Sequence, residues 1–239
     1  MASVFDQRPF ACRCEWGSAA IDALAPADVT IVVDVLSFST CVAVAISRGA
    51  TILPYPWKGA SAAQFADAHG AEVAAPRGEG CYSLSPASFL DAPAGLRCVL
   101  PSPNGAELTP RASRASSRVI AGCLRNAAAV AAAAARLGTT FNVCPAGERW
   151  PDGSLRPAVE DWLGAGAILA ALPGTRSPEA SAAAALFEAC SGRLDDLLRE
   201  CASGRELIDR GFAEDVALAG MIGVSEAVPI FDGVAFVAL

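Results

Sequence analysis

Acidic side chains in two distant parts of the chain are the strongest candidates for chemistry. Asp34 directly follows the apolar run 29–33, and Glu160 and Asp161 are adjacent acids where a helix is expected to begin. An ionised carboxylate at the end of an apolar strand must be hydrogen-bonded or bound to a cation. Two neighbouring carboxylates near a third acid suit a hard divalent cation. Glu160 and Asp161 also suit the first turn of a helix, where acids interact favourably with the helix dipole, so both roles stay open.

Small polar and basic residues that follow the other expected strands could hold an anion. Ser39 and Thr40 lie near a helix start, where free N–H groups and hydroxyls suit a phosphate oxygen. Any single serine or asparagine of this kind also suits an ordinary cap or turn. The other candidates for substrate binding are Ser37, Arg77, Asn104, Gly105, Gly122, Arg125, Asn126, Gly147, Glu148 and Arg149.

Several familiar chemistries are excluded or weak. His69 is the only histidine, so a histidine base, nucleophile or transition-metal site is not expected. The sequence lacks a D-x-D motif after Asp34 and a phosphate-binding P-loop, and Cys144 with Arg149 falls one residue short of a C-x5-R loop. The attacking group is left open among a metal-bound water, a carboxylate and Cys123. A cysteine in such an apolar segment usually packs in the core instead of reacting.

The elements that must position these residues alternate between short β-branched runs and alanine-rich helices. This pattern predicts a single α/β domain over residues 1–239, a three-layer α/β/α fold with a mostly parallel or mixed sheet. Ligands of such sheets bind beyond the C-terminal ends of the strands. Strands are expected at 29–33, 51–54, 72–74, 97–100, 118–121 and 140–144, with a hairpin at 228–237. Helices are expected at 38–48, 60–69, 126–137, 158–172, 178–190, 194–201 and 205–219, and a long loop at 145–157.

The composition limits the kinds of partner that the protein is expected to bind and the cellular compartment in which it is expected to lie. The net charge of −7 argues against nucleic acid, and 53% hydrophobic residues provide ample material for a core. Most of the nine cysteines fall in apolar stretches, and no signal peptide or membrane-spanning run is visible. Cys12 and Cys14 have no second pair suited to zinc. We therefore expect a cytoplasmic protein without a membrane partner, and the alanine-rich helices make a homodimer plausible.

Read in order, segments from Val29 to Val237 resemble the 2-phosphosulfolactate phosphatase family. The matching pieces are Asp34-Val35-Leu36-Ser37-Phe38-Ser39-Thr40, Asn104-Gly105, Gly122-Cys123-Leu124-Arg125-Asn126, Cys144-Pro145-Ala146-Gly147, Glu160-Asp161 with Gly164-Ala165-Gly166, Ser203-Gly204-Arg205, Gly211-Phe212, Asp215-Val216 and Val228-Pro229. The resemblance implies a three-layer α/β/α fold and Mg²⁺-dependent hydrolysis of 2-phosphosulfolactate. Ser37 stands where the family typically has arginine, and two substrate loops are shortened at 77–80 and 83–86, so the substrate can differ.

The resulting hypothesis is a Mg²⁺-dependent phosphatase that acts on the phosphate ester of a small acidic metabolite. Asp34, Glu160 and Asp161 would hold the metal and act in catalysis, with Cys123 as a possible nucleophile. Arg77 or Arg149 would bind the other acidic end of the substrate. The residues expected to cradle the phosphoryl group are Ser39, Thr40, Asn104, Arg125 and Asn126. The alternatives are a non-catalytic protein that binds phosphorylated metabolites and, on sheet–helix alternation alone, a nicotinamide-dependent oxidoreductase.

Overall fold

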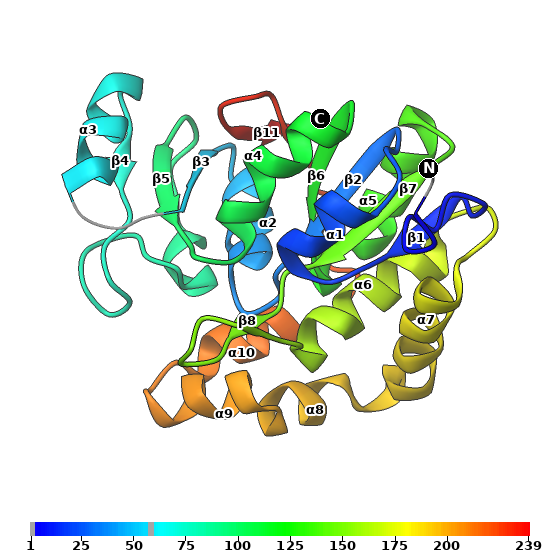
Figure 1. Ribbon diagram of the computed structural model, residues 1–239. Helices are drawn as coiled ribbons and strands as arrows, with labels where there is room; N and C mark the ends of the chain where they lie inside the picture. The colour runs from blue at the N-terminus through cyan, green and yellow to red at the C-terminus, as the bar shows by residue number, and fades with distance from the viewer. Residues whose placement is uncertain (1–2, 57–59) are drawn as a thin grey trace.

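A nine-stranded mixed sheet forms the centre of the protein, whose computed structural model describes residues 3–56 and 60–239 (Figure 1). The strand order is β1-β7-β2-β6-β10-β11-β3-β5-β4, and β8 and β9 pair separately. The strands are β1 (Cys12–Cys14), β2 (Val29–Val33), β3 (Thr51–Tyr55), β4 (Glu72–Val73), β5 (Arg97–Pro101), β6 (Arg118–Gly122), β7 (Phe141–Pro145), β8 (Glu148–Arg149), β9 (Leu155–Arg156), β10 (Pro229–Phe231) and β11 (Phe236–Ala238).

Strand β2 lies at the centre of a parallel group. It pairs with β6 on one side and β7 on the other, and all five of its residues are buried. A strand covered on both faces needs apolar residues throughout, which is why the run 29–33 does not alternate with polar residues. The antiparallel hairpin of β10 and β11 joins this group to a second parallel group of β3, β5 and β4. The mixed sheet expected from the sequence is confirmed.

Helices cover both faces of the sheet and close one end of it. Helices α1 and α4 pack on Val32 and Val119, whereas α5 and α6 pack on Ile31 and Val33. Below the sheet, α8 and α9 lie side by side, and α10 lies between α9 and the sheet (Figure 1). The helices are α1 (Gly17–Ala23), α2 (Phe38–Ser47), α3 (Ala60–His69), α4 (Gly105–Ala115), α5 (Ala127–Leu137), α6 (Val159–Ala171), α7 (Pro178–Cys190), α8 (Leu194–Glu200), α9 (Ala202–Asp209) and α10 (Ala213–Gly220), with 3-10 turns η1 (Pro86–Phe89), η2 (Leu124–Asn126) and η3 (Ser191–Arg193).

The Gly164-Ala165-Gly166 segment lies inside α6, where its glycines allow close packing. A Cβ on Gly164 would lie 2.6 Å from the Val35 side chain, and one on Gly166 would meet the backbone of Ala183 in α7. Both glycines therefore bring α6 against its neighbours, which is a packing role rather than the dinucleotide-binding role of a glycine-rich turn after a strand.

Two sequence expectations about local structure were wrong, and two elements were missed. The single helix expected at 205–219 is two helices, α9 and α10, because the chain turns at Gly211 with a φ of +89°. The expected loop 145–157 contains the β8–β9 hairpin, and β1 and α1 were not expected at all. Short strands such as Glu148–Arg149 carry too few residues for a periodic signal, and tertiary packing decides them. Within the described residues, no helix is long and apolar enough to cross a bilayer.

Candidate active site

The carboxylate of Asp34 is held by the N-termini of two helices. Its Oδ1 accepts a hydrogen bond of 3.0 Å from the Phe38 N–H of α2, and its Oδ2 accepts one of 2.9 Å from the Gly105 N–H of α4. Helix N-termini favour negative charge, so this placement offsets part of the cost of burial. Burial, together with the nearby charge of Glu160, nevertheless raises the pKa of Asp34 to about 6.

Asp161 connects the ends of two central strands instead of facing the cavity. Its Oδ1 accepts a hydrogen bond of 2.7 Å from the Val35 N–H after β2, and its Oδ2 accepts one of 2.8 Å from the Gly147 N–H after β7. Burial, followed by the charges of Asp34 and Glu160, raises the pKa of Asp161 well above its usual value. Unlike Asp34, Asp161 does not line the cavity, so its clearest role is to position the segments that carry Asp34 and Glu148.

Glu148 brings a second carboxylate to the same cavity as Asp34. Its Oε2 accepts a hydrogen bond of 3.0 Å from Asn104 Nδ2. Burial, followed by the charge of Asp34, raises the pKa of Glu148 to about 7, whereas Arg156 acts in the opposite direction. Glu160 is buried, and its charge acts on Asp34 and Glu148, but its side chain does not line the cavity. Of these acids, Asp34 and Glu148 therefore line the cavity, whose lining also includes Glu79 and Glu206.

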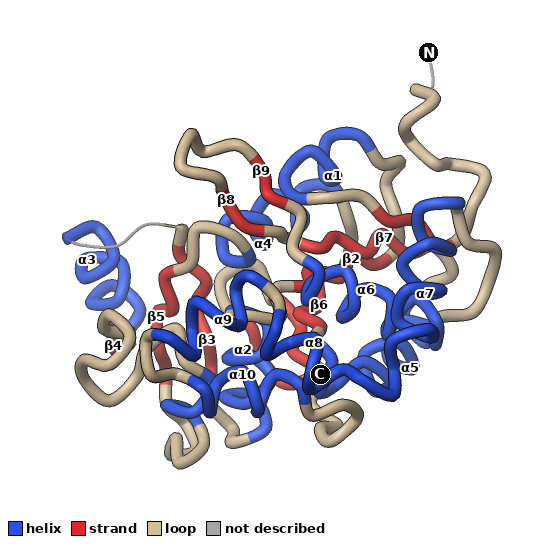
Figure 2. The backbone as a smooth tube through the Cα atoms, turned by 90° about the horizontal axis from the view of Figure 1, so that it is seen from below, coloured by secondary structure: helices blue, strands red, loops and turns tan. Residues whose placement is uncertain are grey.

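The cavity has a volume of about 840 Å³ and lies between the sheet and α9. One wall is acidic and polar, with Asp34, Asn104 and Glu148. The opposite charge comes from four arginines of the same cavity, which are Arg77, Arg149, Arg156 and Arg210. In the view from below, α9 lies in front of the sheet and the β8–β9 hairpin lies toward the upper edge of the picture, and residues of both line the cavity (Figure 2). A cavity lined by both carboxylates and guanidinium groups suits an anion that shares a metal ion with the protein.

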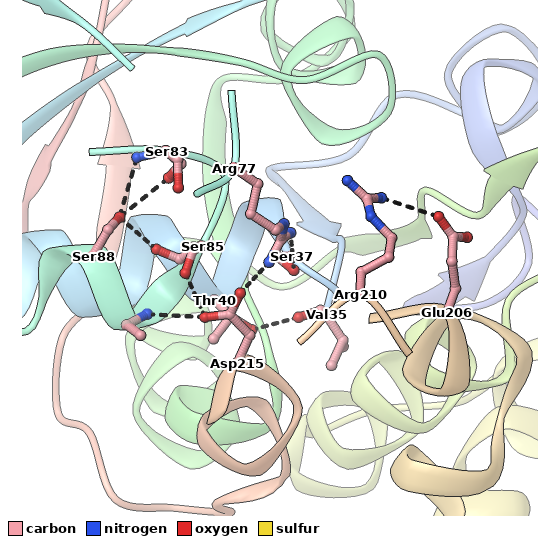
Figure 3. A network of polar contacts seen from close by, with 11 residues as sticks. Val35, Ser37, Thr40, Arg77, Ser83, Ser85, Ser88, Glu206, Arg210 and Asp215 are labelled. Carbon is pink, nitrogen blue, oxygen red and sulfur yellow. Dashed lines mark hydrogen bonds and ion pairs between the residues drawn. The ribbon is translucent and has the colours of Figure 1, made fainter. Parts of the chain in front are cut away.

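Arg77 is fixed by a buried polar network (Figure 3). Its guanidinium pairs with Asp215 of α10, donates a hydrogen bond of 3.1 Å to Ser37 Oγ, and lies 5.2 Å from the centre of the Phe212 ring. Asp215 also accepts hydrogen bonds from Ser85 Oγ and the Ala87 N–H. Ser37 itself lines the cavity. The network thus places the Arg77 charge at the cavity wall and joins the 77–87 loop to α10.

Two arginines of the cavity, Arg156 and Arg210, were not among the residues expected from the sequence. Arg210 at the end of α9 pairs with Glu206 at 3.1 Å and lies 5.9 Å from the Phe212 ring centre. Arg156 ends β9, where its backbone partner across the hairpin is Glu148. Arg156 lies in a hairpin that the sequence did not reveal, and Arg210 lies at an exposed helix end. Nothing in the sequence therefore distinguished these two arginines from ordinary surface arginines.

Other predicted binding residues have roles inside the fold. Ser39 Oγ donates to the Val32 carbonyl and accepts from the Asp34 N–H, and Thr40 Oγ1 donates to the Val35 carbonyl. These hydroxyls fix the turn after β2, so they are not directed at a ligand. Gly105 and Gly147 contribute the backbone amides that hold Asp34 and Asp161.

The Gly122–Asn126 segment also lies outside the cavity. A Cβ on Gly122 would lie 2.6 Å from Ile168, so this glycine serves the packing of α6 on β6. Arg125 donates a hydrogen bond of 2.8 Å to the Leu218 carbonyl, and Asn126 Nδ2 donates one of 3.0 Å to the Ala227 carbonyl. The two side chains anchor the end of α10 and the segment that follows it instead of cradling an anion. Arg149 does line the cavity and pairs with Glu107 of α4 at 2.6 Å.

Replacing Cys123 with alanine is expected to leave turnover within about threefold of wild type. The thiol is completely buried beside Asn126, and burial raises its pKa, which disfavours the reactive thiolate. Loss of the small sulfur group should cost about 1 kcal/mol of stability. Steady-state phosphate release by Cys123→Ala, measured together with its melting temperature, checks this. Activity at background level in a folded variant would restore the thiol as a nucleophile.

Comparison with known proteins identifies the family. A family model described as 2-phosphosulpholactate phosphatase matches residues 19–233. The chain belongs to this family. A probable 2-phosphosulfolactate phosphatase of Symbiobacterium thermophilum is 30% identical over 218 residues, covering 85% of this chain and 91% of that protein. A 2-phosphosulfolactate phosphatase of Methanothermobacter thermautotrophicus is 34% identical over 115 residues, covering 48% of each chain.

Membership of the 2-phosphosulfolactate phosphatase family makes the protein a phosphoric monoester hydrolase by class. It confirms the resemblance that the ordered motifs indicated. It also argues against a nicotinamide-dependent oxidoreductase, in agreement with the packing role of Gly164 and Gly166.

Proposed function

We propose that the protein hydrolyses the phosphate ester of a small metabolite that carries a second acidic group, with 2-phosphosulfolactate as the first substrate to test. The observation that carries this proposal is that Asp34 and Glu148 line the same cavity as four arginines. The names of the relatives support phosphate ester hydrolysis. Arg77 and Arg210, both stacked on Phe212, are suited to the second acidic group of the substrate.

We further propose that Asp34 and Glu148 hold Mg²⁺, with Glu160 as a nearby charge. Within residues 3–56 and 60–239, no group of three or more His, Cys, Asp or Glu side chains is arranged to enclose a metal. Mg²⁺ commonly uses one or two carboxylates and completes its shell with water and substrate oxygens, so two carboxylates facing one cavity fit it. Bound Mg²⁺ would polarise a phosphoryl oxygen and offset charge on the leaving group.

The protein's own groups have distinct tasks in this proposal. The α2 and α4 N–H groups keep Asp34 oriented, and Asn104 Nδ2 keeps Glu148 oriented. Asp161 holds the backbone on either side of them. Cys123 does not line the cavity, and Asp34 and Glu148 are assigned to the metal, so we assign the attack to water that enters the cavity. All nine cysteines are free thiols, which supports a reducing compartment such as the cytoplasm. The homodimer stays a prediction.

Phosphate release should depend on both Mg²⁺ and the second acidic group of the substrate. We expect turnover of 2-phosphosulfolactate with Mg²⁺ and background rates in EDTA. Esters of the same size that lack the second acid should show a higher KM. The measurement is steady-state phosphate release over a panel of small phosphate esters. Binding of these esters without turnover would favour the non-catalytic alternative, and full turnover in EDTA would remove Mg²⁺ from the proposal.

A further inference from the structure

The four arginines of the cavity differ in how their charge is balanced. Arg77 pairs with Asp215, Arg149 with Glu107 and Arg210 with Glu206. In the part of the chain that the structure describes, Arg156 has no carboxylate within ion-pair distance. Its positive charge is therefore the least neutralised of the four, and a guanidinium that has no acidic partner in a cavity is suited to an incoming anion.

Arg156 is nevertheless held in place by neutral groups. Its Nη2 donates a hydrogen bond of 2.8 Å to Ser203 Oγ in α9, and its guanidinium lies 5.8 Å from the centre of the Trp150 ring. These contacts come from both sides of the cavity, one from α9 and one from the β8–β9 hairpin. Arginine has five N–H donors, and the Ser203 bond uses one of them. The side chain is thus preorganised and keeps donors for a ligand.

The hairpin places Arg156 next to the acidic wall. Glu148 and Arg156 are directly opposite each other in the β8–β9 pair, and both line the cavity. Arg77 and Arg210 belong to a different cluster, since both stack on Phe212. The cavity therefore has Arg156 beside its carboxylates, Arg149 neutralised by Glu107, and two cations around Phe212.

We propose that Arg156 is a catalytic residue that binds the oxygens of the phosphoryl group, whereas the arginines around Phe212 bind the other acidic group. This inference rests on the proposed function. A guanidinium beside the transferring phosphoryl group stabilises charge on its oxygens in the transition state, as oriented cations do in phosphoryl-transfer enzymes generally. The phosphoester bond to the organic oxygen breaks, a bond to water oxygen forms, and Arg156 keeps its own proton throughout.

The test measures inhibition by the two products of the reaction. Inorganic phosphate reports on the phosphoryl end of the site, and the dephosphorylated hydroxy acid reports on the other end. In Arg156→Gln, kcat should fall by about 100-fold or more, as for loss of a transition-state donor. The inhibition constant for inorganic phosphate should rise about tenfold or more, and that for the dephosphorylated hydroxy acid should stay within about twofold. Arg156→Lys should keep part of the activity, and guanidinium ion added to Arg156→Ala should restore part of it. Arg199→Gln, in an exposed pair on α8, is the matched control.

Three outcomes would overturn the inference: unchanged kcat in Arg156→Gln, an unchanged inhibition constant for phosphate, or a rise only in that for the hydroxy acid. Melting temperatures show whether each variant is folded. If wild-type protein released no phosphate from any ester, the proposed function would fail instead. Calorimetric titration of wild type and Arg156→Gln with inorganic phosphate would then still decide the role of Arg156, because equal affinities would exclude it as a phosphoryl-binding group.

Discussion

Glu148→Gln is expected to lower kcat by at least about 100-fold and at the same time to stabilise the metal-free protein above pH 5. The amide keeps the size of the side chain and an oxygen that can accept the Asn104 hydrogen bond, so the fold should persist. It removes the carboxylate that we assign to Mg²⁺. The melting temperature of wild type should therefore rise when Mg²⁺ is added at pH 8, and that of the variant should rise less.

The stability gain follows from the pKa of Glu148, which the fold raises from 4.5 to about 7. Below pH 4.5 the carboxyl is protonated in both the folded and the unfolded state. Between pH 4.5 and about 7 the unfolded chain loses this proton more readily, so metal-free wild type loses stability as pH rises through this window. Glutamine does not titrate. The variant should gain on the order of 2 kcal/mol over wild type above pH 7.

Thermal unfolding in EDTA between pH 4 and pH 8, followed by activity assays with Mg²⁺, measures both effects. Glu188→Gln, on the exposed side of α7, is the matched control and should change neither. Full activity of Glu148→Gln would remove the carboxylate from the metal site. A metal-free variant less stable than wild type at pH 8 would show that the buried charge is already balanced in some other way.

Arg77→Met is expected to destabilise the protein by about 3 to 5 kcal/mol, because it leaves Asp215 buried without its cation. The side chains of Arg77 and Asp215 are only 9% and 2% exposed. For a chain of this size the loss corresponds to a fall in melting temperature of roughly 10 °C. Arg77 also lines the cavity, so KM for the acidic substrate should rise in the variant.

A double-mutant cycle isolates the ion pair from other effects. Asp215→Asn can still accept from Ser85 and the Ala87 N–H, so Arg77→Met combined with Asp215→Asn should recover part of the lost stability. Arg199→Met breaks the exposed pair with Asp195 and should cost less than about 1 kcal/mol. Chemical denaturation of the four proteins gives the coupling energy. Purely additive losses would mean that Arg77 contributes packing on Phe212 and no specific pairing with Asp215.

Most of the sheet and its large helices could be predicted from the chain itself. The buried run 29–33, the glycine that ends α5 at Gly138 and the Ser177 cap before Pro178 are local signals, and they appear in the structure as β2, α5 and α7. The break between α9 and α10 was missed because Gly211 and Phe212 interrupt an otherwise helical composition. The β8–β9 hairpin was missed because two-residue strands have no period to detect.

The site was predicted only in part, since polar residues after strands look alike in sequence. Asp34, Asn104 and Glu148 reach the cavity, whereas Arg125 bonds to the end of α10 and Asn126 to the chain that follows it. Both kinds of residue follow strands, and the direction of each side chain depends on the neighbours that it meets. Arg156 reaches the cavity only because β9 pairs with β8, which sets it opposite Glu148.

By itself, the sequence determined the α/β alternation and the acidic residues available for chemistry. It also showed a single histidine, His69, which argues against histidine chemistry, and the family to which the ordered motifs point. Tertiary structure alone decided which acids face the cavity, that Asp161 binds backbone amides, and that four arginines surround one space. Local signals depend on a few consecutive residues, whereas a site depends on distances between residues that are remote along the chain. Those distances exist only once the sheet has paired and the helices have packed on it.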